Sequence, residues 1–355
     1  MGKLPNQSLI AKELNLAPGT VSRALRQSPG IHPETRERVQ QYAKKLGYTI
    51  RSRGRAIADA DGHYLGVLVQ TPESTWIQPH HLVGLSEAAA RMNATLIVHY
   101  VGFRDCANVL NANNQPIAMR DGRVKGVCLI HRWPQEVVEK LTRHYACVSI
   151  VNFFPSVNVD LIDIDHRGGM NQLFEHLYAF GHRKIGFFGL TGSFSWSRAR
   201  FAGYVDALMR HGLSYNSQWV IPLQPESYEE RYMPESAVQE AIRLVQQQGV
   251  RAWMGTNEWA GHALVNGFMK AGLKVPEDVS VTGFDYTEAI PKAAMQLTSV
   301  GVSLSLIGEV TIRTLRQRLA NPDEPRQSIL FSCDMIAGQS TGPLQGSASG
   351  SRGAT

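Results

Sequence analysis

The sequence lacks the features of membrane, secreted and metal-binding proteins. None of its 355 residues belongs to an apolar run approaching the roughly 18 residues of a membrane span. Residues 1–15 carry charges at short intervals and no apolar core, unlike a secretory signal peptide. The cysteines are few, scattered and without CxxC spacing, which favours reduced thiols in a cytosolic protein over a disulfide framework or zinc ribbon. They are Cys106, Cys128, Cys147 and Cys333.

Motifs for catalysis and cofactor binding are also missing. No apolar strand-like run is followed by GxGxxG or GxxxxGK[ST], and the chain contains no HExxH. The histidines are mostly scattered, and no pair shares metal-ligand spacing with a carboxylate. We interpret them as isolated surface or capping residues. The sequence therefore predicts no catalytic residues, no metal site and no cofactor.

Charge is unevenly distributed along a chain of otherwise ordinary composition. Hydrophobic residues make up 43% and charged residues 19%, as expected for a globular protein of two or three structural units. Residues 1–60 contain eleven Lys or Arg against four Asp or Glu, an excess of seven, while the whole chain has a net charge of +6. Such asymmetry indicates a polyanionic partner for the N-terminal segment. Charge alone leaves a solvated basic face as an equal alternative.

The N-terminal segment has the pattern of a helix-turn-helix. Residues 6–15 place Leu9, Ile10 and Leu14 on one helical stripe, and Pro18 can start a second helix over residues 18–26. A third helix is expected after Pro33 and before Gly47. In such an arrangement the second helix lies in the major groove of DNA. Any small three-helix bundle is the structural alternative, but the basic excess and the polar second helix favour DNA binding.

These residues resemble the DNA-binding headpiece of the LacI/GalR (lac-repressor) family. The resemblance rests on IAKELNLAPGTVSRAL and IHPETRERVQQYAKKLGY, above all the strings TVSRAL, PETR and LGY. It implies that the start of the second helix and the arginine of TVSR read bases. Pro18 and Gly19 carry no hydrogen-bonding side chain here, so we expect Arg23 and Thr20 to read most bases, with Ser22 and Arg26 beside them. Ala17 replaces the serine that usually caps this helix, at a cost of about 1 kcal/mol.

The resemblance also implies a hinge segment at residues 50–61. A plain flexible linker is the alternative. In the family this segment forms a helix on operator DNA and inserts an apolar side chain into the minor groove. Ile57 stands at the insertion position, with Arg51, Arg53 and Arg55 against phosphates. Ile50 and Arg51 replace the usual Pro-Asn, and Gly54 would cost about 1 kcal/mol within a helix.

Residues beyond 62 alternate apolar strand-like runs with helical patterns. The runs include YLGVLVQ, ATLIVHY, VKGVCLI, CVSIVN, KIGFFGL, AWMGTN and VSVTGFD. This alternation predicts βαβ units in parallel sheets, with too many strands for one sheet and hence two subdomains. Ligands bind beyond the carboxyl ends of such strands.

The same region resembles the family's periplasmic-binding-protein-like core. The strings IDIDHRGG, LYAFGHRKIGFFG, RARFAGYVDAL, VPEDVSVTGFD, QLTSV and AGQSTGP carry this resemblance. The fold class it implies is an all-α helix-turn-helix headpiece plus an α/β core of two doubly wound parallel-sheet subdomains. We expect a headpiece at 1–49, a hinge at 50–61, a core at 62–343 and a flexible tail at 344–355. Within the core, the N-subdomain is expected at about 62–162 and 292–323, and the C-subdomain at about 163–291 and 324–343.

Effector-binding positions follow from the resemblance, residue by residue. Arg200 matches the arginine that grips the effector, and Asp285 matches the acid on the opposite wall. The other positions carried over are Trp196, Asn257, Asp165, Tyr232, Ile77 and Gln78. For each of them a structural ion pair or a core aromatic is the alternative. An Arg–Asp pair with aromatic faces suits a sugar, and a purine fits similar chemistry.

The sequence therefore predicts a sequence-specific transcriptional regulator, most simply a repressor, that binds double-stranded operator DNA. We expect a homodimer without a membrane association, in the bacterial cytoplasm at the nucleoid, controlled by a small-molecule effector of the sugar class. Two alternatives stay open: a small-molecule-binding protein with a vestigial headpiece, and a regulator with a purine-type effector. For an enzyme on the same α/β core, the sequence offers no nucleophile–base pair and no metal-ligand set.

Overall fold

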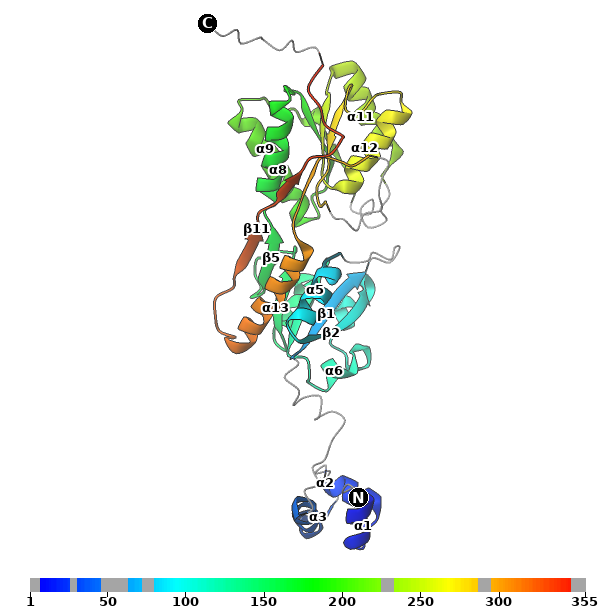
Figure 1. The fold of residues 1–355 in the computed structure, drawn as a ribbon, viewed down its shortest axis with the longest axis vertical. Coiled ribbons are helices and arrows are strands. Elements are labelled where there is room, and N and C mark those ends of the chain that lie inside the picture. Colours follow the sequence, from blue (N-terminus) through cyan, green and yellow to red (C-terminus); the bar gives the residue numbers. More distant parts are fainter. Residues whose placement is uncertain are drawn as a thin grey trace. The chain divides into compact units, whose positions relative to one another are not determined.

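The computed structural model describes residues 7–25, 31–45, 63–71, 80–224, 233–286 and 295–345 (Figure 1). The chain divides into two compact units, Met1–Gly62 and His63–Thr355. The predicted DNA-contacting residues Arg26, Arg51, Arg53, Arg55 and Ile57 lie outside the described residues. The same holds for the predicted effector-contacting residues Tyr232, Ile77 and Gln78.

The first unit contains the three predicted helices. They are α1 (Gln7–Glu13), α2 (Pro18–Leu25) and α3 (Pro33–Lys45). Asn15 adopts a left-handed backbone conformation, with φ 53°, just after α1 ends. Asparagine tolerates this conformation better than most residues do. The helices share a small core that includes Ile10, Val21, Ala24 and Val39, so this unit has its own apolar centre.

A six-stranded parallel sheet forms the first half of the second unit. Its strand order is β11-β5-β4-β3-β1-β2, and every neighbouring pair is parallel. The strands are β1 (His63–Thr71), β2 (Ala94–Gly102), β3 (Gly126–Ile130), β4 (Ala146–Ile150), β5 (Asp160–Ile164) and β11 (Ser328–Phe331). All five residues of β3 are buried, as expected for a central strand covered on both faces.

A second, four-stranded parallel sheet has the order β7-β6-β8-β9. Its strands are β6 (Ile185–Leu190), β7 (Val220–Pro222), β8 (Ala252–Gly255) and β9 (Ser280–Thr282). A short antiparallel pair joins β10 (Ser299–Gly301) to β12 (Asp334–Ile336). Two parallel sheets with intervening helices confirm the predicted fold class.

Helices cover both sheets. Figure 1 shows α8 and α9 on one side of the second sheet and α11 and α12 on the other. The longer helices are α5 (His80–Arg91), α8 (His166–Ala179), α9 (Ser195–Arg210), α11 (Glu235–Gln248), α12 (Glu258–Lys270) and α13 (Leu304–Ala320). Shorter elements are η1 (Phe103–Asn108), η2 (Ala112–Asn114), α6 (Ile117–Arg120), α7 (Gln135–Leu141) and η3 (Ser217–Trp219). No helix among the described residues is long and apolar enough to cross a membrane.

Two features differ from the sequence-based expectations. β11 pairs with β5 in the first sheet, whereas the sequence assigned residues 324–343 to the second subdomain. The chain therefore remains in the first sheet until Phe331, because the pairing with β5 holds it there. Two histidines expected at the surface or at helix caps are buried, His166 at 4% exposed and His182 at 3%. His182 Nε2 lies 3.1 Å from Ser280 Oγ and 3.0 Å from the Gly342 carbonyl, so local polar partners satisfy it.

Candidate functional site

Polar residues gather beyond the carboxyl ends of strands from both sheets. Asp165 directly follows β5, Thr256 and Asn257 follow β8, and Asp285 follows β9 by three residues. Arg200 comes from α9, the helix after β6, and reaches Thr256 and Asp285. Carboxyl ends of parallel strands are where α/β proteins bind ligands. Of the eight positions predicted to contact an effector, the structure describes Arg200, Asp285, Trp196, Asn257 and Asp165.

Arg200 and Asp285 form a bidentate ion pair. Arg200 Nη1 donates to Asp285 Oδ2 at 2.8 Å, and Nη2 donates to Oδ1 at 2.6 Å. Nη1 also donates to the Thr256 carbonyl oxygen at 2.6 Å. The Arg200 side chain is only 3% exposed, whereas the Asp285 side chain is 44% exposed. The arginine is therefore the buried member of this pair, and Asp285 is the member whose side chain is partly exposed.

The surroundings of Asp285 favour its charged form. The protein atoms packed around the carboxylate act to raise its pKa, but the Arg200 charge and hydrogen bonds outweigh them and hold the pKa below its ordinary value. Asp285 has a φ of 69°, in the left-handed region that costs most side chains energy. Backbone strain of this kind gathers at binding sites, where surrounding contacts hold it.

Aromatic rings line the pair. The Arg200 guanidinium lies over the Phe284 ring at 3.7 Å and over Trp196 at 4.9 Å from the ring centroids. Trp196 stacks on Phe194 with centroids 5.4 Å apart and planes 11° from parallel. Arg132, which follows β3 of the first sheet, lies 5.8 Å from the Phe194 ring centroid. The site therefore combines a carboxylate with flat apolar faces.

Asp165 and Asn257 cap helices. Asp165 Oδ1 accepts a hydrogen bond from Gly168 N at 2.9 Å at the start of α8. Asn257 Oδ1 accepts one from Ala260 N at 2.9 Å at the start of α12. Capping satisfies backbone donors that a helix leaves open at its start, so both residues have a structural role here. Each uses one side-chain oxygen for this role.

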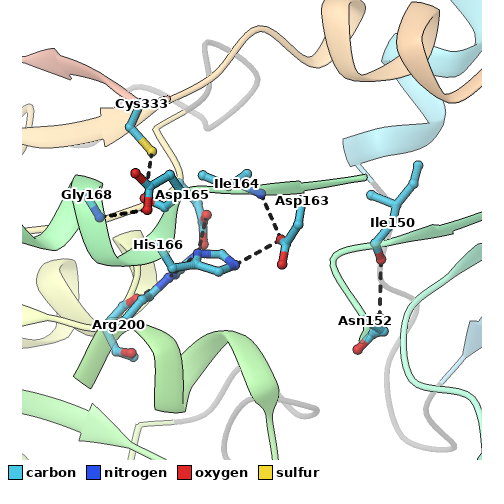
Figure 2. A network of polar contacts seen from close by, with 11 residues as sticks. Ile150, Asn152, Asp163, Ile164, Asp165, His166, Gly168, Arg200 and Cys333 are labelled. Atoms are coloured by element: carbon cyan, nitrogen blue, oxygen red, sulfur yellow. Dashed lines mark hydrogen bonds and ion pairs between the residues drawn. The ribbon is translucent and has the colours of Figure 1, made fainter. Parts of the chain in front are cut away.

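Sequence reasoning missed His166. Its Nδ1 accepts a hydrogen bond from Arg200 Nε at 3.2 Å, and its Nε2 lies 3.1 Å from Asp163 Oδ1. Figure 2 shows the ring between these two partners. Its position beside Asp165 in IDIDHRGG was the available signal, since the neighbouring residue was already a candidate.

Glu258 is a second polar residue whose setting the sequence did not reveal. It is 5% exposed, and its Oε1 finds no hydrogen-bond partner among the described residues. Its Oε2 lies 3.5 Å from His262 Nε2, one turn along α12. Among the described residues, no three His, Cys, Asp or Glu side chains gather closely enough to hold a metal ion.

The candidate DNA-reading residues lie on α2. Pro18 and Gly19 are exposed at its start, and Thr20 is half-buried. Arg23 is exposed, and its Nε donates back to the Gly19 carbonyl at 3.3 Å. Ser22 lies in α2, with its side chain outside the described atoms. The Thr20 and Val21 amides donate to the Ala17 carbonyl at 2.9 and 3.2 Å, so this backbone oxygen accepts where α2 begins.

Comparison with known proteins identifies both units. Residues 10–50 match the model of bacterial regulatory proteins of the lacI family, and residues 174–341 match that of the periplasmic binding protein-like domain. Catabolite control protein A of Priestia megaterium is 25% identical over 312 residues, covering 86% of this chain and 90% of the relative. The PurR transcriptional repressor of Haemophilus influenzae strain KW20 is 24% identical over 320 residues, covering 89% and 91%.

Solved structures share the fold along the chain. The complex of the transcriptional regulator CelR with cellobiose gives a TM-score of 0.65 at 22% identity, covering 95% of this chain and 99% of that one. The lac repressor dimer bound to operator and an anti-inducer gives 0.64 at 18% identity, covering 96% and 100%. The chain therefore has a lacI-family helix-turn-helix domain ahead of a periplasmic binding protein-like domain.

Proposed function

We propose that the protein is a transcriptional repressor that binds operator DNA as a homodimer and changes its operator affinity when a small molecule binds beside Asp285. The observation that carries the ligand-binding half is the Arg200–Asp285 pair, whose half-exposed Asp285 side chain lies beyond the carboxyl ends of the strands of the second sheet. The DNA-binding half rests on α2 and the lacI-type match over residues 10–50. A two-fold symmetric operator requires two headpieces, hence the dimer. The proposed location is the bacterial cytoplasm, at the nucleoid.

The chemistry of the pair favours a ligand that donates hydrogen bonds. Four contacts already occupy the Arg200 guanidinium, which has five N–H groups. Each carboxylate oxygen of Asp285 takes one of these bonds and retains capacity for another. Neighbouring hydroxyl groups on a sugar can supply the donors, while Trp196 and Phe194 offer flat faces for the ring. A sugar is therefore the effector class that we propose.

Ligand binding acts on DNA affinity only through a difference between two states. A ligand that binds one state of the core more tightly shifts the protein toward that state by its differential affinity. A ligand that favours the DNA-binding state strengthens the operator complex, and one that favours the other state weakens it. Measurement of operator affinity with and without the ligand decides between the two.

A thermal-shift panel tests the ligand site. The purified chain is heated with mono- and disaccharides, sugar phosphates, nucleosides and nucleobases, because a compound that binds the folded form raises the melting temperature. We expect a shift with a neutral sugar and its loss in Asp285→Ala. Asp206→Ala is the matched control, since Asp206 is a half-exposed aspartate whose partners Arg210 and Arg167 lie on α9 and α8. A shift with a nucleobase alone would favour the purine alternative, and an equal shift in Asp285→Ala would remove Asp285 from the site.

A further inference from the structure

His166 lies buried between an arginine and an aspartate. The residue is 4% exposed, and its ring meets Arg200 Nε at Nδ1 and Asp163 Oδ1 at Nε2, at 3.2 and 3.1 Å. The two partners come from different parts of the core, Arg200 from α9 beside the second sheet and Asp163 from β5 of the first sheet. Figure 2 shows this row of side chains, in which the imidazole is the link.

The partners dictate which ring nitrogen carries the proton. A guanidinium does not lose its protons in proteins, so Arg200 Nε–H must donate and His166 Nδ1 must accept. A neutral imidazole with an accepting Nδ1 carries its proton on Nε2. That proton points at the Asp163 carboxylate, which accepts it. The arrangement therefore specifies the neutral Nε2–H tautomer.

We propose that His166 is a positioning residue of the ligand site, whose neutral Nε2–H ring holds the Arg200 guanidinium against Asp285 and links it to β5. This role rests on the proposed function only in that Asp285 is the ligand-facing group. His166 itself is buried behind Arg200 and touches the site through it.

The remaining contacts of Arg200 show why its orientation depends on this bond. The Nη1 and Nη2 groups face Thr256 and Asp285, so the Nε edge is the side that His166 holds. The Phe284 ring packs against both residues, at 3.7 Å from the guanidinium and 5.8 Å between ring centroids for His166. Without the His166 Nδ1 acceptor, Arg200 Nε loses its hydrogen bond. The guanidinium can then turn away from Asp285.

At the other end of this hydrogen-bonded row, Asp163 belongs to β5, which pairs with β11 in the first sheet. Asp163 Oδ1 also accepts from Ile164 N at 2.8 Å, and β5 pairs with β11 along Asp163 and Leu330. A change at Asp285 therefore has a continuous path of hydrogen bonds, through Arg200 and His166, to the edge of the first sheet. Coupling between sites needs such a physical connection with distinct arrangements.

Two substitutions test the hydrogen bonds of the two His166 ring nitrogens separately. The Oδ1 of an asparagine can occupy the place of Nδ1, so His166→Asn retains an acceptor for Arg200 and loses the hydrogen bond to Asp163. The Nε2 of a glutamine can occupy the place of the ring Nε2, so His166→Gln retains the donor to Asp163 and loses the acceptor. The two variants are similar in size and polarity, and each is the control for the other.

The experiment is nitrogen NMR on the full chain with labelled histidine and arginine, without any ligand. The His166 signals are assigned by their absence in His166→Asn, and the Arg200 Nε–H signal by its absence in Arg200→Lys. We expect His166 to be a neutral ring protonated on Nε2 near pH 7.5, and Arg200 Nε–H to give a signal protected from exchange with water. That protected signal should persist in His166→Asn and disappear in His166→Gln.

Three results would overturn the proposal. They are a ring protonated on Nδ1, an exchange-averaged Arg200 Nε–H in the unmodified protein, and a protected Nε–H in His166→Gln. Circular dichroism of both variants verifies that the fold is retained. Because no ligand is used, the outcome is independent of the thermal-shift panel, and either proposal can fail alone.

Discussion

At the scale of single residues, the two members of the Arg200–Asp285 pair differ in exposure and in role. Arg200 is 3% exposed and engaged by His166, Thr256 and Asp285, whereas the Asp285 side chain is 44% exposed. A buried guanidinium is tolerated because it is paired and hydrogen-bonded. Loss of Asp285 would leave that charge without its carboxylate.

Asp285→Asn should therefore destabilise the second unit, by an amount that depends on pH. We expect a loss of about 1 kcal/mol near neutral pH, below the usual value for a charged hydrogen bond, because solvent reaches the Asp285 side chain and screens the pair. The Asp285 pKa lies below its ordinary value of 3.8 in the folded protein, so the charged form stabilises the fold above that pH. Urea unfolding of both proteins from neutral pH downward measures the difference.

The difference between the two proteins should stay constant at neutral and mildly acidic pH. It should shrink as the pH falls below the ordinary aspartate value and through the folded-state pKa, where protonation removes the pair. A difference that grows on acidification would contradict this assignment of the charge.

The sequence predicted which residues meet at this site better than it predicted what they do. The family strings predicted Arg200 and Asp285 on opposite walls of one pocket, and the structure has them in direct contact as an ion pair. They could not show which member is buried, because exposure depends on how α9 packs beside the strand ends. They also missed His166, since a histidine of a scattered set has no recognisable spacing until the chain brings Asp163 and Arg200 to it.

At the scale of elements, α5 and α13 approach through glycines. A Cβ atom at Gly308 of α13 would clash with the Gly84 carbonyl group of α5, and one at Gly84 would clash with the Leu304 carbonyl group. The absence of side chains at these positions lets the two backbones touch. Alternating apolar runs predicted the helices and sheets, but glycine contacts between segments far apart in sequence have no such local pattern.

Gly308→Ala should force α5 and α13 apart. Overpacking of a close contact typically costs about 1–3 kcal/mol, and here the obstacle is backbone that cannot rotate away. We expect a cost at the upper end of that range in urea unfolding followed by tryptophan fluorescence. Gly192→Ala is the control, because a Cβ there meets nothing within 4 Å. Equal stabilities of the two variants would show that the helices do not make this contact.

At the scale of the whole molecule, the chain consists of two units with separate cores. The first has its own small apolar centre around Ile10, Val21 and Val39, and the second contains both sheets. The charge asymmetry along the sequence already indicated this division, because the basic excess ended where the alternating strands began. All six tryptophans lie beyond residue 62, so their fluorescence reports on the second unit alone.

Val21→Ala should destabilise the first unit without changing the second. Val21 is 0% exposed in a core of few side chains, and truncation of a buried aliphatic residue costs about 2 kcal/mol. We expect an earlier loss of helical circular dichroism on heating, with the tryptophan transition unmoved. A matching shift of the tryptophan transition would instead mean that the two units unfold together.

Cysteine chemistry gives a test of the core as a whole. All four cysteines are buried, and burial raises the pKa of Cys106 to about 11 and that of Cys333 to about 12. Burial also raises the pKa values of Cys128 and Cys147. Since the thiolate is the reactive form, the folded protein should react with a thiol reagent near pH 8 far more slowly than the unfolded chain. Rapid reaction of any thiol in the folded state would contradict the packing around it.

Sequence-specific DNA binding is the central claim, and a selection experiment tests it most directly. The full chain is incubated with random-sequence double-stranded DNA near physiological salt, where non-specific phosphate contacts are weak, and the bound molecules are sequenced over several rounds. A dimeric reader predicts enrichment of one two-fold symmetric sequence, with Arg23→Ala relaxing the preference at one base position of each half. Binding without enrichment of any sequence would contradict the account, and would leave a small-molecule-binding protein with a vestigial headpiece.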